Sequence, residues 1–286
     1  MSRVLRRRLM ERMVIHAVLA AVCVTILAPI VWLAVSAFKT NADFFDWLLL
    51  PMRPEGGVAW ERLTSVHFRR LFGELGFGRA MLNSVFLSSA TALGATLSSA
   101  MAGYALARHE FRGKRLINAV VLGVLVVPTA LLLPPTYQLL YRAGLLDSYA
   151  GVILPGIAPA FGVYLFRQAT LSSVPRQIME AARVDGAGEL RIFFDIALPL
   201  LRPMVGTMLL ITFLGTWNNF IIPQIVLQQP EKFPLATAVA QIRGVYYQDY
   251  GLLMAATFVS VVPMLALFLV LQREFITGLT AGAVKG

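Results

Sequence analysis

The stretch that decides how this chain is organised is residues 172–203, a charged segment between apolar ones, which reads SSVPRQIMEAARVDGAGELRIFFDIALPLLRP. Proline lacks an N–H that would be unpaired in a first helical turn, so Pro175 suits a helix start, with one of the preceding serines as the N-cap. The helix should run to Asp185 and stop at Gly186, because glycine avoids the ~1–2 kcal/mol that a β-carbon costs at positive φ. A second short helix from about Gly188 completes a predicted two-helix knob.

The charges of the first knob helix allow two interpretations. At 100° per residue, Glu180 shares a face with Arg176 and Arg183, and these side chains could simply pair in water. Alternatively, the Glu180 side chain binds a partner protein. Periodicity alone leaves both interpretations open.

The rest of the chain has the composition of a polytopic membrane protein. Of its 286 residues, 58% are hydrophobic and 14% are charged. Because a spanning segment must satisfy its own backbone hydrogen bonds, we expect an all-α fold. Six apolar segments predict six transmembrane helices: 14–38, 81–106, 116–140, 149–168, 204–227 and 251–271. The first could also be a signal peptide, but its apolar run is longer than such peptides use, so an uncleaved helix is favoured.

Charge asymmetry predicts the orientation. With six spans, one side holds 16 basic and 7 acidic residues, and the other holds 9 and 8. The positive-inside rule then places both termini and residues 172–203 in the cytoplasm of a prokaryotic cell, with the chain in its cytoplasmic membrane. Residues 39–80 and 228–250 become external loops.

Two further patterns concern the spans themselves. Small residues recur along one face of the second span and predict close helix packing: Ser84, Ser88, Ala92, Ala95, Ser99 and Gly103. The third and fourth spans contain several prolines each. Broken helices at membrane depth survive where protein or a watery cavity satisfies the freed carbonyls, so these spans either line a pathway or carry purely structural kinks.

The spacing within residues 172–203 resembles a known family. Glu180-Ala181-Ala182, three residues, Gly186, nine residues, Ile196, one residue and Leu198-Pro199 reproduce the EAA loop of binding-protein-dependent ABC importer permeases. The flanking residues are similar to the carbohydrate-uptake branch, which includes the maltose-type importers: Pro175, Asp185, Ala187, Pro203, Trp217, Asn218 and the ending GLTAGAVKG.

This resemblance implies a single transmembrane permease domain, residues 1–286, that serves an ATP-driven importer of a sugar or oligosaccharide. The EAA loop would dock on a separate ATPase subunit through Glu180, Ala181, Ala182, Asp185, Gly186, Ala187, Ile196, Leu198 and Pro199. The tail at 278–286 would contact the ATPase pair through Gly278, Leu279, Thr280, Gly282 and Lys285. The loop at 228–250 would meet an external solute-binding protein through Arg243, Tyr246 and Tyr247. A second, homologous permease would complete the pathway.

Three adjacent polar or aromatic residues in the fifth span are candidates for lining the pathway: Trp217, Asn218 and Asn219. An indole can stack on a sugar ring and an amide can bond its hydroxyls. The other interpretation is an interhelical hydrogen bond, worth about 0.6 kcal/mol.

The sequence argues against several other functions. It holds no Gly-x-x-x-x-Gly-Lys-Ser/Thr loop, so ATP and Mg²⁺ should bind the partner ATPase, and this chain should be no enzyme. One cysteine and three scattered histidines predict neither disulfides nor a metal site. The basic charge does not follow a nucleic-acid-binding fold. Two alternatives remain: a permease for glycerol phosphate or another small solute, and an ion-driven transporter, for which intramembrane ionisable pairs are missing.

Overall fold

The computed structural model describes residues 3–242 and 249–281, and throughout these residues the chain is helical, with isolated β-bridges in place of strands. The chain forms two compact units. Unit 1 comprises the chain up to Gly76 and a segment ending at Val261, and unit 2 comprises Phe77–Ala240 and the segment from Val262 onward. The α-helices are α1 Arg3–Ser36, α2 Asn41–Asp46, α3 Val66–Gly73, α4 Phe77–Arg108, α5 Lys114–Val124, α6 Leu133–Arg142, α7 Tyr149–Ile153, α8 Ala160–Ser173, α9 Arg176–Val184, α10 Glu189–Ile192, α11 Leu198–Leu200, α12 Arg202–Trp217, α13 Ile221–Val226, α14 Leu235–Gln241 and α15 Tyr250–Ala281.

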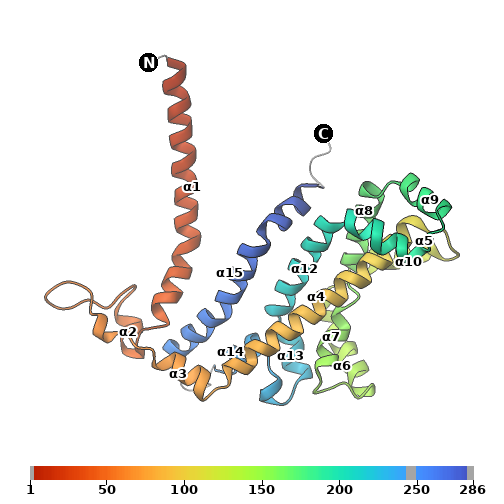
Figure 1. Ribbon diagram of the computed structural model, residues 1–286. Coiled ribbons are helices and arrows are strands. Elements are labelled where there is room, and N and C mark those ends of the chain that lie inside the picture. Colours follow the sequence, from red (N-terminus) through yellow and green to blue (C-terminus); the bar gives the residue numbers. More distant parts are fainter. Residues whose placement is uncertain (1–2, 243–248, 282–286) are drawn as a thin grey trace. The chain divides into compact units, whose positions relative to one another are not determined.

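The core of unit 2 is α4 with α8 and α12 packed along it (Figure 1). Glycines allow the close approach of α4 and α8. A β-carbon on Gly103 would lie 2.6 Å from the backbone nitrogen of Arg167, and one on Gly162 would lie 2.4 Å from the Ser99 hydroxyl. The predicted close packing of the small-residue face is confirmed, because larger side chains there would push the helices apart.

The proline-rich spans are broken, as their sequences indicate. Lys114–Val124 and Thr129–Arg142 meet at 107°, and Tyr149–Gly156 and Ala160–Ser173 meet at 42°. Pro128 and Pro159 each stand in extended backbone immediately before a new helical segment. A proline cannot donate to the preceding turn, so these breaks follow directly from the sequence.

The fifth span is shorter than predicted. Helix α12 ends at Trp217, and α13 begins only at Ile221. The Asn219 side chain accepts a hydrogen bond from the Ile222 N–H at 3.3 Å, which gives the backbone an alternative to the helical ladder. The prediction of one helix over 204–227 was therefore wrong.

Helix length and composition agree with six spans. Met10–Ser36, Phe77–Arg108 and Tyr250–Leu269 are each long and apolar enough to cross a bilayer, and three bent helix pairs raise the total to as many as six. One of these pairs joins Glu189–Leu200 to Arg202–Trp217. Because Glu189–Leu200 carries the exposed ion pair between Arg191 and Asp195, we assign that segment to the knob.

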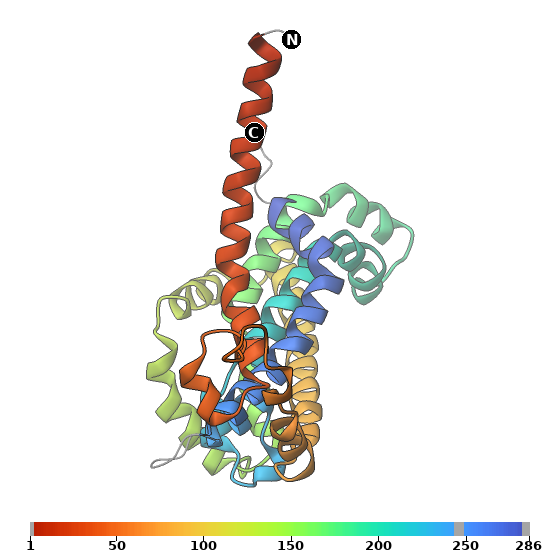
Figure 2. The same cartoon turned by 90° about the vertical axis from the view of Figure 1, so that its left-hand side faces the viewer.

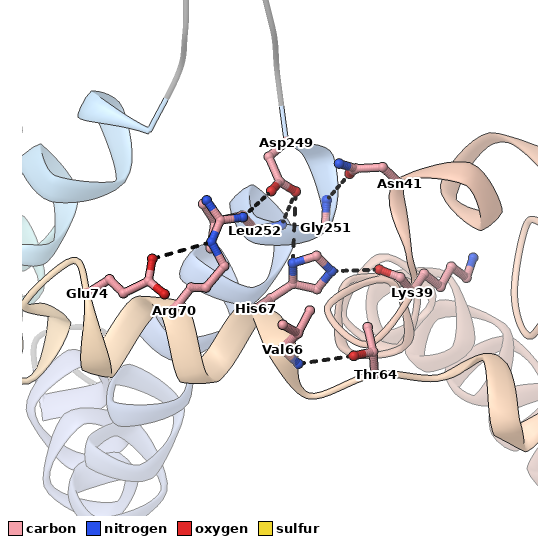
Figure 3. A network of polar contacts seen from close by, with 10 residues as sticks. All are labelled: Lys39, Asn41, Thr64, Val66, His67, Arg70, Glu74, Asp249, Gly251 and Leu252. Carbon is pink, nitrogen blue, oxygen red and sulfur yellow. Dashed lines mark hydrogen bonds and ion pairs between the residues drawn. The ribbon is translucent and has the colours of Figure 1, made fainter.

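Unit 1 contains α1, the segment 37–76 and the start of α15. The segment 37–76 is folded, as predicted, by α2, α3 and a network of polar contacts with α15 (Figure 3). The Asp249 carboxylate accepts hydrogen bonds from the Leu252 N–H at 3.0 Å and from Arg70 at 2.8 Å. Burial acts against ionisation of Asp249, but these hydrogen bonds outweigh it and lower the pKa of the carboxyl group.

A fully buried lysine completes this network. The Lys39 ammonium donates to the backbone oxygens of Trp47 at 2.6 Å and Leu48 at 3.1 Å, and burial lowers its pKa. The His67 ring bonds the Lys39 carbonyl oxygen at 2.9 Å and packs so closely on Gly251 that a β-carbon there would meet the ring at 2.3 Å. The segment 37–76 is thus tied to the first turn of α15.

Candidate functional site

The candidate site is the knob formed by α9 and α10, the most distinctive element of the sequence. Helix α9 ends at Val184 with Asp185 as its C-cap, and Gly186 adopts a left-handed conformation with φ of 83°. Gly188, in extended backbone, precedes α10. The predicted helix, glycine turn and second helix are confirmed. In both views of the molecule the knob lies at the end of α12 opposite α13 (Figure 1 and Figure 2).

The predicted cap of the first knob helix was wrong. Ser172 and Ser173 belong to the end of α8, where Ser172 donates to the Ala169 carbonyl oxygen at 3.1 Å, and Pro175 itself occupies the N-cap position of α9. Two extended residues, Val174 and Pro175, join the helices. From the sequence alone, either serine could cap the knob helix. The sequence does not reveal that α8 continues to Ser173 and includes both serines.

A dry cluster fixes the base of the knob to the core of unit 2. Met179 of α9 and Ile192, Phe193, Ala197 and Leu201 are buried together against α4 and α8. The Tyr104 hydroxyl of α4 lies 3.5 Å from the sulfur of Met179. Phe193–Ala197 form a π-helical turn, a wider turn that is frequent at functional sites.

A guanidinium group reinforces this base. Arg108, the last residue of α4, donates to the carbonyl oxygens of Thr170, at 2.8 Å, and Val174. Both oxygens lie at the C-terminal end of α8, where the Thr170 oxygen also accepts from the Val174 N–H and a positive charge complements the helix dipole. The knob is therefore held to two core helices and can transmit a displacement to them.

The motif residues divide into an outward set and an inward set. Glu180, Ala181, Asp185, Gly186 and Pro199 are exposed, whereas Ala182, Ala187, Ile196 and Leu198 are partly buried. A shallow notch of about 330 Å³ lies between α9 and the segment after α10. Three residues of the inward set line it, Ala182, Ala187 and Ile196, together with Asp185, Arg191, Ile192 and Asp195. The motif thus specifies both the packing of the knob and its outer surface.

The ion pairing of the knob differs from the solvated pairing that helical periodicity allows. The Arg183 guanidinium binds Glu189 across the glycine turn, with Nε–Oε1 at 2.6 Å and a second bond at 3.2 Å. This pairing raises the pKa of Arg183. Within the part of the chain that the structure describes, the exposed Glu180 side chain has neither an ion pair nor a hydrogen bond.

The knob that carries this glutamate also exposes large apolar side chains. Val184 is 88% exposed, Leu190 is 66% exposed and Phe194 is 45% exposed. Charged residues are common on solvated loops, but three large apolar side chains on a short charged loop indicate a contact surface. The sequence reasoning did not single out these three residues, although the apolar positions between the charges were visible in it.

A second feature of unit 2 is a cavity of about 420 Å³ whose mainly apolar lining also presents several hydroxyls and one amide. Its lining comes from α4, from both proline-broken spans and from the break between α12 and α13: Ser84, Leu87, Ser88, Thr91, Thr129, Ala130, Leu132, Leu133, Thr136, Val152, Pro155, Gly156, Thr216, Asn219, Ile221, Ile222, Pro223 and Pro234. The hydroxyls of Ser88 and Thr91 are buried and lack a hydrogen-bond partner among the described residues. Such hydroxyls are available to water or to a polar ligand.

Of the three residues predicted to line a pathway, one lines this cavity. Asn219 does, together with Thr216. Trp217 is 3% exposed and stacks on Phe213 at 5.6 Å, while the exposed Asn218 donates to the Leu214 carbonyl oxygen at 2.9 Å. The residues that sequence reasoning missed are Thr91, Thr129 and Thr136, because their convergence depends on how the broken spans fold.

Asp147 holds the described start of the loop 228–250 through a set of hydrogen bonds, which we call the Asp147 clasp. Its carboxylate accepts hydrogen bonds from the Gln228 N–H at 2.9 Å, the Gln229 N–H at 3.2 Å and the Lys232 ammonium at 2.8 Å. Lys232 and these amides lower the pKa of Asp147. The loop therefore leaves unit 2 from a fixed base.

Asn83 and Ser84 of α4 hold the next residues of the loop. Asn83 donates to the carbonyl oxygens of Glu231 and Phe233 at 2.9 and 3.1 Å, and the Ser84 hydroxyl accepts from the Leu235 N–H at 2.7 Å. The predicted contact residues Arg243, Tyr246 and Tyr247 lie outside the described residues. Of the predicted tail, Gly278, Leu279 and Thr280 belong to the end of α15, and Gly282 and Lys285 lie outside the described residues.

Comparisons with known proteins agree with the motif and the fold. Residues 94–275 match the model of the family "Binding-protein-dependent transport system inner membrane component". An arabinooligosaccharide transport system permease protein of Halalkalibacterium halodurans is 39% identical over 229 residues, which cover 78% of this chain and 80% of that protein. A lactose transport system permease protein of Rhizobium radiobacter is 30% identical over 285 residues and covers all of both chains.

A solved structure has the same fold. One chain of a bacterial ABC transporter involved in import of the acidic polysaccharide alginate superposes with a TM-score of 0.79 at 21% identity, covering 96% of this chain and 99% of that one. The family model covers most of unit 2, including the knob and the cavity lining from Thr129 onward. This chain therefore belongs to the binding-protein-dependent transport system inner membrane components, the permease subunits of ABC importers.

Proposed function

We propose that this chain is a permease subunit of an ATP-driven ABC importer for a sugar or oligosaccharide and forms half of its translocation pathway. Relatives named for transport of arabinooligosaccharides, diacetylchitobiose and lactose support this substrate class. The cavity fits it, since its mainly apolar lining presents hydroxyls and an amide and includes no charged side chain. Such groups bond sugar hydroxyls without favouring ions.

The observation that carries the proposal is the outer surface of the knob. Glu180 makes no hydrogen bond and no ion pair in the described part of its own chain, and the apolar side chains of Val184 and Leu190 are exposed on the same knob. A surface of this kind fits a cleft that supplies a cation and covers the apolar groups. We assign the cleft to a separate ATPase subunit, which would bind the ATP and Mg²⁺.

Coupling then follows from the rigid base of the knob. ATP-driven closure of an ATPase pair moves the docked knobs, and a state change reaches the membrane only through contacts that differ between the states. The buried cluster around Phe193 and the Arg108 hydrogen bonds connect each displacement of the knob to α4 and α8. Helix α4 also forms part of the cavity wall.

The remaining partners follow the same reasoning. A second, homologous permease would complete the pathway, and an external solute-binding protein would deliver the sugar to the loop 228–250, which starts from the Asp147 clasp. Arg243, Tyr246 and Tyr247 are our candidates for that contact, and the tail 278–286 is our candidate for contact with the ATPase pair. Both termini would lie in the cytoplasm of a prokaryotic cell.

Reconstitution of transport in liposomes tests the proposal. The chain, its second permease and ATPase subunits should import sugar from a loaded binding protein only with ATP inside, and uptake should survive collapse of proton and sodium gradients. Uptake that proceeds without the ATPase and stops when a gradient is collapsed would instead establish an ion-driven transporter.

A further inference from the structure

A crevice in unit 2 remains outside the account of coupling and transport. It has a volume of about 310 Å³ and lies among the end of α4, the second half of α5 and the middle of α8: Leu106, Asn118, Val121, Leu122, Val163, Tyr164, Arg167 and Gln168. We call it the Arg167 crevice. Arg167 is its one charged lining residue, and no carboxylate lines it.

Arg167 is an unusual residue for this position. It lies within α8, in one of the helix pairs that meet the criteria for a membrane span. Its side chain is partly buried, and its Nε atom is buried without a hydrogen-bond partner in the described part of the chain. Among those same residues it has no ion pair. A guanidinium presents five N–H donors and cannot lose its charge, so such a group calls for an acceptor from outside the chain.

Arg108 provides an informative contrast. It also lies at this end of the helices, but its guanidinium donates to the carbonyl oxygens of Thr170 and Val174. These bonds give Arg108 a structural role in holding the end of α8. Arg167 makes no such hydrogen bond in the described structure, although it lies on α8 itself, about one turn before Thr170.

The depth and the lining of the crevice indicate the ligand. Arg167 is the penultimate residue of the predicted span 149–168, and the end of a span lies at the level where headgroups meet acyl chains. Asn118, Tyr164 and Gln168 add neutral polar groups to the same lining, the Asn118 amide also donating to the Lys114 carbonyl oxygen at 3.0 Å, while Val121 and Leu122 supply an apolar wall. The fork of an arginine matches two oxygens of a phosphate.

We propose that the Arg167 crevice binds the phosphate group of an anionic phospholipid, with the headgroup on Arg167 and an acyl chain along α5. The basic residues Arg112, Lys114 and Arg115 at the start of α5 add a positive field that attracts anionic lipids. A lipid held here would occupy the groove between α5 and α8, next to the helix that leads into the knob.

Native mass spectrometry of the detergent-purified transporter tests the proposal directly. Phosphatidylglycerol should remain bound about tenfold more tightly than phosphatidylcholine, and Arg167→Gln should weaken phosphatidylglycerol binding about tenfold. Arg115→Gln is the matched control, because it removes the same charge near the same helix end but outside the crevice lining, and it should change binding by less than about threefold. Arg167→Lys should retain part of the preference, since it keeps the charge and loses the fork.

Three results would overturn the proposal. One is equal retention of both lipids by the unmodified transporter. Another is an equal effect of Arg167→Gln and Arg115→Gln, which would reduce the effect to general surface charge. A third is displacement of the lipid by millimolar inorganic phosphate, which would make the crevice a site for a free anion. If Arg167→Gln fails to fold, Asn118→Leu removes a neutral donor from the same crevice and should weaken phosphatidylglycerol binding about threefold.

Discussion

Replacing Gly186 with alanine changes the backbone geometry of the knob and removes none of its charged or polar side chains. Gly186 has a φ of 83°, and a β-carbon there would have no atom within 4 Å, so the substitution meets no steric clash with its surroundings. Its whole effect is the left-handed backbone, which costs a residue with a β-carbon about 1–2 kcal/mol. The native angle between α9 and α10 should then be populated about 5- to 30-fold less, and the affinity for the ATPase subunit should fall by the same factor.

Gly188→Ala is the control for this substitution. Gly188 is exposed, has no atom within 4 Å of a β-carbon and has a φ of −72° and ψ of 157°, which any residue adopts. Its ATPase affinity should stay within about twofold of the unmodified chain. The measurement is the Kd of the purified ATPase subunit for the permease pair in nanodiscs, by surface plasmon resonance. Equal losses for both variants, or no loss for either, would refute the argument from backbone geometry.

Three further predictions address topology, the loop clasp and the cavity. In a chain lacking its native cysteine, Glu55→Cys should react with an impermeant maleimide added outside cells and Gly188→Cys should not, and the reverse pattern would contradict the predicted orientation. Because the folded pKa of Asp147 is lowered, its contribution to stability is present above the ordinary Asp pKa of about 4 and is lost as pH falls through the lowered value. Hydrogen exchange at the two loop amides that donate to it, corrected for intrinsic rates, should accelerate over that acidic range, and unchanged protection there would contradict the clasp. Asn219→Ala should lower sugar uptake several-fold while Asn218→Ala, outside the cavity lining, should change it little, and equal effects would remove the cavity from the pathway.

The knob was the part most accessible to sequence reasoning because its signals are local. A helix that ends before Gly186 depends on a residue's own backbone preference, and the breaks at Pro128 and Pro159 depend on missing N–H groups. The face of small residues on α4 likewise specifies its own packing with α8.

The errors came from contacts between residues that no local pattern connects. Arg183 lies on the same helical face as Glu180, but it pairs with Glu189 because the glycine turn folds that residue back beside it. Trp217 and Asn219 are equally plausible pathway residues from the sequence. In the structure, however, Trp217 at the end of α12 is buried in the core, and Asn219 lines the cavity. The unpaired Arg167 could be recognised only after its surroundings were known.

The central claim is that Glu180 docks on a separate ATPase subunit, and the affinity of that subunit for a Glu180→Gln chain tests it most directly. Since the side chain is exposed and without a partner in the described structure, the substitution should leave insertion and folding of the permease unchanged. Loss of one member of a desolvated ion pair typically costs about 3–5 kcal/mol, so ATPase binding should weaken more than a hundredfold. Glu110→Gln, which removes an equal charge from an exposed pair with Lys114 outside the knob, should leave binding within about threefold. Unchanged binding with Glu180→Gln would make this residue a solvated surface group and would contradict the assigned coupling role.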